Sequence, residues 1–230
     1  MILKDKILFQ PPEIGCVLSL TGLPGGGSKI YDRSAYGNIG TITGATWVKL
    51  PSGLWCLSFD GQDDYVDCGN PSAMDFTTED FTVELWFYAN TLAGYQSFIS
   101  RGQQNVKGWE IQFRDSGNLW FKTYTAGAYQ STRAGINTFA AGVWYHLAVV
   151  RQGADAKIYK SGSDVNAPAG SHPVSLVSAS DVNLMMGRYA AQVMYLMNGL
   201  LSRIRIYNRA LTALEIQNHF NQEKHLFSVW

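Results

Sequence analysis

Near its end the chain carries the stretch NGLLSRIRIYNRAL at residues 198–211, and TALEI follows directly at residues 212–216. The pair Asn198 and Gly199 predicts a turn, because both residues tolerate the positive φ of tight turns. After the turn two sets of residues alternate, as they do along a half-buried β-strand. We expect a strand whose mainly apolar face carries Leu200, Ser202, Ile204, Ile206 and Asn208, and whose charged face carries Leu201, Arg203, Arg205, Tyr207 and Arg209.

A short helix is predicted directly after this strand. Thr212 can cap its N-terminus while Glu215, three residues later, bonds back to the Thr212 backbone, which is a capping box. Leu211 and Ile216 stand at the two positions of a hydrophobic staple around the same cap. Such a cap contributes about 1 kcal/mol, which sets where the helix begins but indicates no function.

This strand and capped turn resemble the end of a laminin-G-like jelly roll of the concanavalin A-like lectin/glucanase class. Two further blocks resemble the same family, in the same order. They are VLSL at residues 17–20 with YDRSAYGNIG at residues 31–40, and LSFDGQDDYV at residues 57–66. The resemblance implies an all-β fold, a two-sheet antiparallel jelly-roll sandwich with a short C-terminal helix. Because this fold hosts lectins, glycosidases, adhesion modules and structural proteins, it implies no single function.

The composition and the strand patterns agree with that fold. The 230 residues include 23 glycines and 13% aromatic residues, and only 16% are charged, as in short strands joined by glycine turns. Residues 81–88 show the clearest alternation, with Phe81, Val83, Leu85 and Phe87 on the predicted core face.

A chain of this length suits one large domain, since all-β sandwiches reach this size without splitting. We expect the jelly roll over residues 16–221, an N-terminal arm over residues 1–15 and a C-terminal tail over residues 222–230. The apolar residues of the arm favour packing along the sandwich or docking on a neighbour.

The charge balance and the absence of export signals limit the partners and the location. Lys and Arg together number 18, as do Asp and Glu, and no basic stripe is present, which argues against nucleic acid. No stretch approaches the roughly 20 apolar residues of a membrane span. Asp5, Lys6 and two prolines interrupt any signal-peptide core. We therefore expect a virion component or release by a non-classical route, and otherwise a cytoplasmic protein.

Two of the three cysteines are predicted to face each other. Pairing Phe59 with Tyr65 across the turn at residues 60–64 places Cys56 directly opposite Cys68. Reduced, buried thiols are favoured because no export signal is visible. A disulfide stays an open alternative.

No catalytic residues are expected. Glycosidases need two carboxyl groups about 5–5.5 Å apart for the retaining mechanism. Asp80 and Glu84 share a strand face but stand four residues apart, about 13 Å along a strand. A cross-strand pair of Glu84 with Glu110 remains an alternative, and with it a glycoside hydrolase. The four histidines show no metal-ligand spacing.

The family resemblance also implies a structural calcium ion between the D-x-S loop and an aspartate of the closing strand. Asp32 matches the loop position, but Ser202 and Arg203 stand where the usual acidic pair would be. Losing a carboxylate weakens a site that needs 6–8 oxygen ligands. Calcium is therefore left open beside two alternatives, an Asp32 pair with an arginine such as Arg203, and Asp32 closing its own turn.

The predicted recognition surface consists of side chains on the non-core faces of three strands that we expect to be adjacent. Aromatic rings with amide and carboxylate groups between them suit the C–H faces and hydroxyl edges of a saccharide. Aromatic residues are equally typical of protein interfaces. The candidate glycan-binding or partner-binding residues are Glu84, Trp86, Tyr88, Gln112, Trp120 and Tyr124, with Thr82 and Lys122 beside them.

These observations together predict a non-catalytic binding, adhesion and structural module. The preferred setting is a larger assembly such as a phage virion, as a tail, fibre or capsid decoration protein that is an oligomer or part of one. Its expected partners are glycans, neighbouring protein subunits, or both. A free-standing carbohydrate-binding lectin is the alternative.

Overall fold

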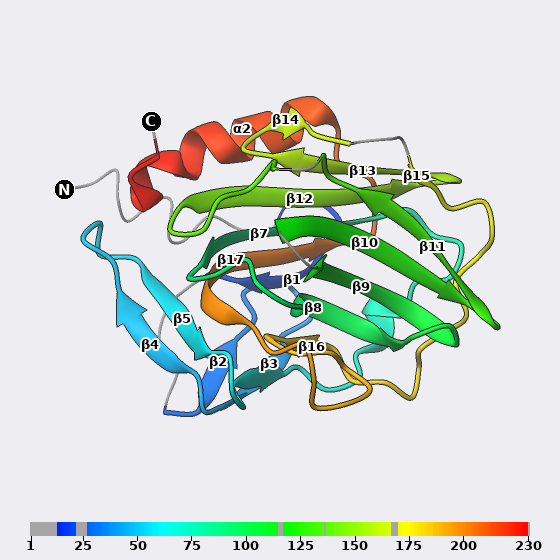
Figure 1. Cartoon of the computed structure of the whole chain (residues 1–230), viewed down its shortest axis with the longest axis horizontal. Helices are drawn as coiled ribbons and strands as arrows, with labels where there is room; N and C mark the ends of the chain where they lie inside the picture. The colour runs from blue at the N-terminus through cyan, green and yellow to red at the C-terminus, as the bar shows by residue number, and fades with distance from the viewer. Residues whose placement is uncertain (1–12, 22–26, 115–116, 136, 167–169, 230) are drawn as a thin grey trace.

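The computed structural model describes residues 13–21, 27–114, 117–135, 137–166 and 170–229. Most of the predicted N-terminal arm, residues 1–12, lies outside the described residues. Two antiparallel β-sheets form the body of the protein, and helix α2 (Ala213–Glu223) runs beside strands β13 and β14 at the top of Figure 1. The predicted all-β sandwich with a short C-terminal helix is therefore confirmed.

The first sheet, called sheet A, has β7 and β17 at its centre. Strand β1 adds to β17, and β15 adds to β13. Its main order is β14 (Ser163–Asp164), β13 (Asp155–Lys160), β12 (Trp144–Gln152), β7 (Phe81–Ala89), β17 (Asn198–Tyr207), β5 (Trp55–Asp60) and β4 (Thr46–Lys49), with β1 at Cys16–Leu20 and β15 at Gly170–Ser171.

The second sheet, called sheet B, faces sheet A and has its long strands at one end. The 3-10 helix η1 (Ser72–Met74) lies in the connection that leads to β7. The order of sheet B is β11 (Ala128–Arg133), β10 (Asn118–Thr125), β9 (Lys107–Arg114), β8 (Gln96–Gln103), β16 (Met185–Met186), β6 (Tyr65–Asp67), β3 (Ile39–Thr43) and β2 (Lys29–Tyr31).

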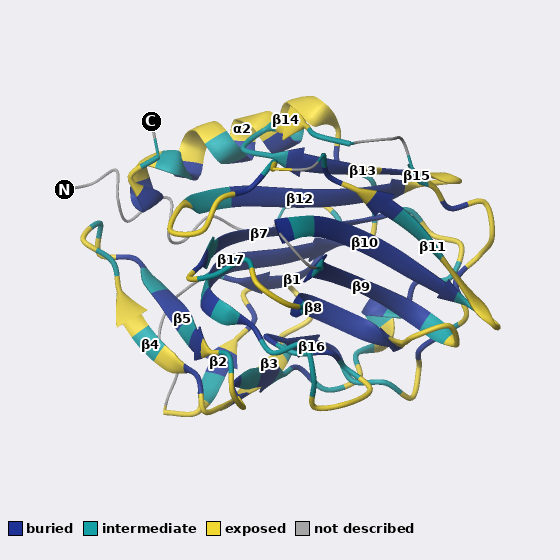
Figure 2. Ribbon diagram, in the orientation of Figure 1, coloured by how far each residue is buried: buried dark blue, intermediate teal, exposed yellow. Residues whose placement is uncertain are grey.

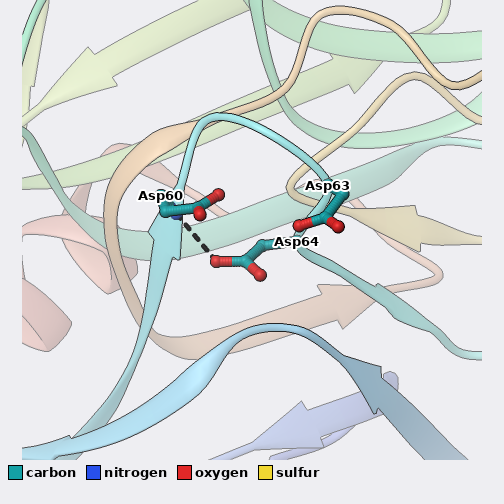
Figure 3. Close-up of side chains that lie close together, drawn as sticks. All are labelled: Asp60, Asp63 and Asp64. Carbon is teal, nitrogen blue, oxygen red and sulfur yellow. Dashed lines mark hydrogen bonds between the residues drawn. The ribbon is translucent and has the colours of Figure 1, made fainter.

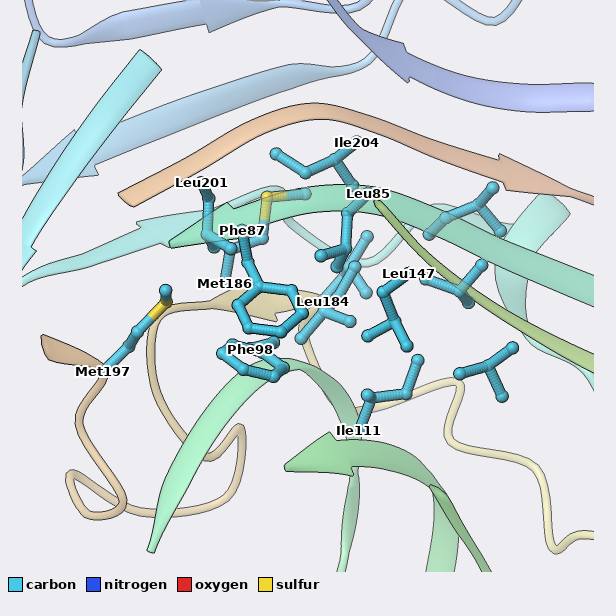
Figure 4. Packing of buried hydrophobic residues seen from close by; sticks show 14 of the residues in the cluster. Leu85, Phe87, Phe98, Ile111, Leu147, Leu184, Met186, Met197, Leu201 and Ile204 are labelled. Carbon is cyan, nitrogen blue, oxygen red and sulfur yellow. The ribbon is translucent and has the colours of Figure 1, made fainter. Parts of the chain in front are cut away.

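The core lies between the two sheets and is rich in aromatic rings. Leu85 and Phe87 of β7 point into it, as the alternation of residues 81–88 predicts. Phe87 packs against Phe98 of β8 with ring centroids 4.8 Å apart, and Ile111 of β9 joins the same cluster (Figure 4). Figure 2 shows that the central strands of both sheets are buried along most of their length.

The predicted opposition of Cys56 and Cys68 is wrong. Cys56 lies on β5 of sheet A opposite Val48, while β6, just before Cys68, belongs to sheet B. The turn at residues 60–64 therefore crosses between sheets and joins no simple hairpin. All three cysteines are buried free thiols, and burial raises the pKa of each to about 12.

A β-bulge interrupts the predicted alternation of β17. The register against β7 shifts between Ser202 and Arg205, and Arg203 adopts a positive φ of 49°. Because the bulge inserts a residue, Leu201 and Ile204 both face the core while Ser202 lies opposite Trp86 on the outer face. The prediction that Leu200 and Ser202 share the core face is therefore wrong.

Helix α2 begins after Thr212, as predicted. Thr212 and Glu215 form both bonds of the capping box. The helix continues to Glu223, and the 3-10 helix η3 (Lys224–Phe227) follows it directly. Leu226 and Phe227, within the predicted C-terminal tail, are buried. No helix among the described residues is long and apolar enough to cross a bilayer.

Candidate functional site

The outer face of sheet A is covered by the C-terminal end of the same chain. Trp86 is fully buried, its ring stacks on Phe227 with centroids 4.1 Å apart, and its Nε1 donates to Glu223 Oε2 at 2.7 Å. Glu84 is also fully buried, and Tyr88 is half-buried beside Trp144. These three predicted recognition residues therefore lie on a face that the protein itself closes.

Beneath the helix, Glu84 is the centre of a buried ion network. Its carboxylate lies 2.9 Å from His146 Nε2, 2.9 Å from His219 Nδ1 and 3.1 Å from the guanidinium of Arg205. Burial opposes its ionisation, but the Arg205 charge and the histidine contacts hold the pKa of Glu84 well below its usual range. His219 Nε2 also lies 3.0 Å from Glu13 Oε1.

Glu223 forms the second half of this network. One of its oxygens lies 2.7 Å from Arg203 Nε and 2.7 Å from Arg205, and these charges outweigh burial and lower the pKa of Glu223 to about 2. Burial lowers the pKa of His219, but its bonds to Glu13 and Glu84 more than reverse this and raise it to about 9. The charges of this network are therefore paired with one another, and the ion pairs hold helix α2 against sheet A.

The sequence analysis did not predict this ion network, although one local sequence signal indicates it. His219 and Glu223 stand four residues apart in a helix with a clear cap, so they share one helix face with Ile216. A buried helix face that carries two ionisable groups requires charged partners on the sheet beneath.

The outer face of sheet B brings the other predicted residues together. Gln112 of β9 lies directly opposite Trp120 of β10, and Glu110 lies opposite Lys122. Because β7 pairs with β12 and β17, the predicted adjacency of strand 81–88 to these strands is wrong. The alternative Glu84–Glu110 pair fails for the same reason, since the two residues belong to different sheets.

Polar groups are buried on this outer face without complete bonding. Tyr124 donates its hydroxyl to Glu110 Oε2 at 2.7 Å, and burial raises the pKa of both groups. Gln112 is fully buried, yet neither atom of its amide has a hydrogen-bond partner within the part of the chain that the structure describes. Glu110 Oε1 also lacks a partner there, although such buried groups are normally satisfied.

Three cations surround the indole of Trp120. The guanidinium carbon of Arg133 lies 3.8 Å from the ring centroid, that of Arg114 lies 4.4 Å away, and Lys122 Nζ lies 5.7 Å away. Arg114 also donates to the Tyr95 hydroxyl at 2.8 Å. The described residues place no carboxylate within ion-pair distance of these three cations.

A cleft of about 660 Å³ lies beside β8 and β16, which are in the middle of sheet B. The ion pair of Lys107 with Asp181, 2.5 Å long, lines one part of it. Tyr189 and Tyr195 line another part, and their rings lie 5.7 Å apart. This volume is in the range of pockets that hold small ligands.

The surroundings of Asp32 do not fit a calcium ion. Its two oxygens accept five hydrogen bonds, from groups of Ser19, Ser34 and Asn38, at 2.6 to 3.1 Å. These donors present positive hydrogen atoms where a cation would sit, so the geometry fits the turn-closing role of Asp32. Arg203 binds Glu223, so the predicted Asp32–Arg203 pair is not formed.

Three acidic residues meet in the turn that links β5 to β6 (Figure 3). Single ligand atoms of Asp60, Asp63 and Asp64 lie within 4.8 Å of one another. The backbone N–H of Asp60 donates to Asp64 at 2.8 Å, and that of Gln62 donates to Asp60 at 2.8 Å. Closure of the turn explains the cluster by itself.

The fold and these two faces define a lectin-like β-sandwich, and the comparisons give its family. Residues 60–217, more than half of the chain, match the family described as the concanavalin A-like lectin/glucanases superfamily, of laminin G type. The chain belongs to this superfamily. A search of curated protein sequences finds no significant match.

Solved structures with the same fold include clostridial toxin domains. The binding domain of Paraclostridial Mosquitocidal Protein 1 has a TM-score of 0.72 and 18% identity over 95% of this chain and 52% of that one. A botulinum neurotoxin type C structure, titled for cell entry that depends on two ganglioside molecules, has a TM-score of 0.68 and 16% identity. The match covers 90% of this chain and 51% of that one. The botulinum neurotoxin DC binding domain, in complex with rat synaptotagmin II, has a TM-score of 0.69 and 17% identity, over 90% of this chain and 51% of that one. The chain thus spans about half the length of these structures.

Proposed function

We propose that the chain is a non-catalytic glycan-binding module that recognises its ligand through the outer face of sheet B and the adjoining cleft. One contrast carries the proposal. The outer face of sheet A is closed by the chain's own helix, whereas the outer face of sheet B keeps Gln112 without hydrogen-bond partners among the described residues. A hydroxyl-rich ligand supplies the donors and acceptors that such an amide lacks.

The aromatic rings next to the cleft suit a sugar. Tyr95 and Tyr195 stack with centroids 5.1 Å apart, and Tyr189 continues the row. Tyrosine combines an apolar ring face with a hydroxyl at its edge, which matches the two kinds of surface on a saccharide. The ion pair of Lys107 with Asp181 adds charged hydrogen-bonding groups at the same place.

The comparisons support binding rather than one particular ligand. The similar structures are toxin binding domains, and the titles of two of them name gangliosides and a protein receptor. At 13–18% identity these likenesses show the fold alone. The assignment of a glycan to this chain therefore depends on the chemistry of sheet B.

A glycan array tests the proposal. We expect binding by the native chain and its loss in Tyr195→Ala, with an unchanged melting temperature. The matched control is Tyr36→Ala, which removes an exposed tyrosine near the β2 edge, at the other end of sheet B. A reducing-end assay on the bound glycans should detect no cleavage. An array without any bound glycan would refute the function, and cleavage would refute its non-catalytic part.

A second candidate is a subunit of a larger assembly, of which a virion tail or fibre is one form. Tyr31 and Ile39 pair across β2 and β3 at the edge of sheet B, and both are about half exposed together with Tyr36. Exposed apolar groups on an edge strand suit pairing with another subunit. Sedimentation of Ile39→Ser against the native chain tests this, with dissociation of an oligomer as the expected result.

A further inference from the structure

The three cations around Trp120 favour a charged ligand over a neutral sugar on the outer face of sheet B. Arg133 and Arg114 lie against the indole, and the ring is only 9% exposed. A neutral sugar stacks its C–H groups on an open aromatic face, and this face is already occupied. Trp120 therefore acts as a platform that orients guanidinium groups and offers little contact of its own.

The positive charge of this platform is poorly matched by the surrounding groups. Glu110 is the one acidic group facing it among the described strands β8 to β11, and its carboxyl group is bonded to the Tyr124 hydroxyl. Lys122 lies opposite Glu110 across the strands but makes no ion pair with it closer than 4 Å. Three cations thus lie within 6 Å of one ring in a chain whose formal net charge is zero.

A second and independent observation indicates a ligand at the same place. Gln112 is the direct cross-strand neighbour of Trp120, so both side chains rise from the same face of the sheet. The amide of Gln112 is fully buried, and both of its polar atoms lack partners within the described residues. The cations and the amide together provide donors for an anion and a donor and acceptor for a neighbouring hydroxyl.

We propose that Arg114, Lys122 and Arg133 around Trp120 form a subsite for the carboxylate or sulfate group of an acidic sugar. This inference rests on the proposed glycan-binding function and names the ligand class of the same face. The planar guanidinium groups suit the bidentate recognition of such planar or tetrahedral anions. Gln112 then bonds a hydroxyl of the same sugar or of the next one.

A compact patch favours an acidic sugar over other polyanions. Nucleic-acid surfaces carry basic groups along a stripe that follows the phosphate backbone. Here the three cations gather around a single indole, and Arg114 and Lys122 also lie over the rings of Tyr95 and Tyr129. That arrangement matches one anionic group with polar neighbours.

Matched pairs of charged and neutral glycans test the subsite. The probes are sialyllactose and sulfolactose, each measured against neutral lactose by titration calorimetry. We expect the charged member of at least one pair to bind at least 10-fold more tightly at 50 mM salt. This advantage should shrink at 300 mM salt, because salt screens exposed charges.

Variants locate the effect. Arg133→Gln should weaken binding of the charged probe at least 10-fold, and Arg133→Lys should weaken it less because it keeps the charge. The matched control Lys157→Gln, an exposed cation on β13 of sheet A, should leave binding unchanged. Unchanged melting temperatures would show that the variants fold.

The outcomes separate this inference from the proposed function. Equal binding of charged and neutral glycans, unaffected by Arg133→Gln, would overturn the acidic subsite and leave the glycan-binding function standing. A glycan array without any bound glycan would overturn both. Preferential binding to duplex DNA or to phosphatidylserine vesicles, with neither charged glycan bound, would overturn the sugar assignment in favour of another anion.

Discussion

The two outer faces of this sandwich carry similar residue types but differ in what packs against them. On sheet A, Trp86 and Glu84 are surrounded by side chains of the C-terminal helix, and their polar atoms find partners within the chain. On sheet B, the ring of Trp120 lies against the guanidinium groups of Arg114 and Arg133, and the amide of Gln112 has no hydrogen-bond partner among the described residues. A tryptophan next to charged groups on a strand is therefore no sign of recognition where another element of the chain supplies its partners.

The largest expected effect is on the covered face. Trp86→Ala should destabilise the protein by about 4 kcal/mol, because it empties a fully buried site and removes the contacts of Phe227. Trp120→Ala should cost less than half as much, since its ring packs against the half-buried Arg114 and the exposed Arg133 instead of a closed aromatic cluster. Urea unfolding measures both, and equal losses would abolish the distinction between the faces.

The next effect concerns the buried ion network. Glu223→Gln should cost about 3 kcal/mol, because it leaves Arg203 and Arg205 buried with too little negative charge. The control Asp155→Asn removes an exposed carboxylate of β13 and should change stability by less than about 0.5 kcal/mol. A similarly small change in Glu223→Gln would show that the network does not lock the helix to the sheet.

The pH dependence of the unfolding free energy tests the same ion network. The pKa of His219 is raised from 6.5 to about 9 in the folded chain, where Glu84, Glu13 and Arg205 surround it and Tyr207 stacks on it. Its contribution is therefore complete below pH 6.5 and is lost as the pH rises to 9, by on the order of 3 kcal/mol. Unfolding free energies at pH 6 and pH 9.5 should differ less in His219→Gln than in the native chain. Parallel pH curves for the two proteins would contradict this assignment.

The smallest expected effect is at Gln112, on the outer face of sheet B. Gln112→Leu should leave stability within about 1 kcal/mol of the native value or raise it, because it replaces an amide without described partners by an apolar side chain of similar size. The same variant should weaken glycan binding on the array. A large loss of stability would show that the amide has a structural role that the contacts of the fold do not account for.

Much of the fold could be predicted because its signals are local. The alternation of residues 81–88 and the capping box of Thr212 with Glu215 depend on neighbours a few positions away. The bulge at Arg203 was missed, since nothing in the neighbouring residues marks an inserted position. The opposition of Cys56 and Cys68 was predicted wrongly because a tight turn can also connect two different sheets.

For the candidate site, the sequence determined which side chains leave the core, because a strand places successive side chains on opposite faces. Only the tertiary structure decided which of those faces the C-terminal helix covers. Trp86 is covered by Glu223, which is 137 positions away in the chain, while Gln112 and Trp120 come together on sheet B. Strand order and helix docking depend on contacts between distant segments, and no local period in the sequence records them.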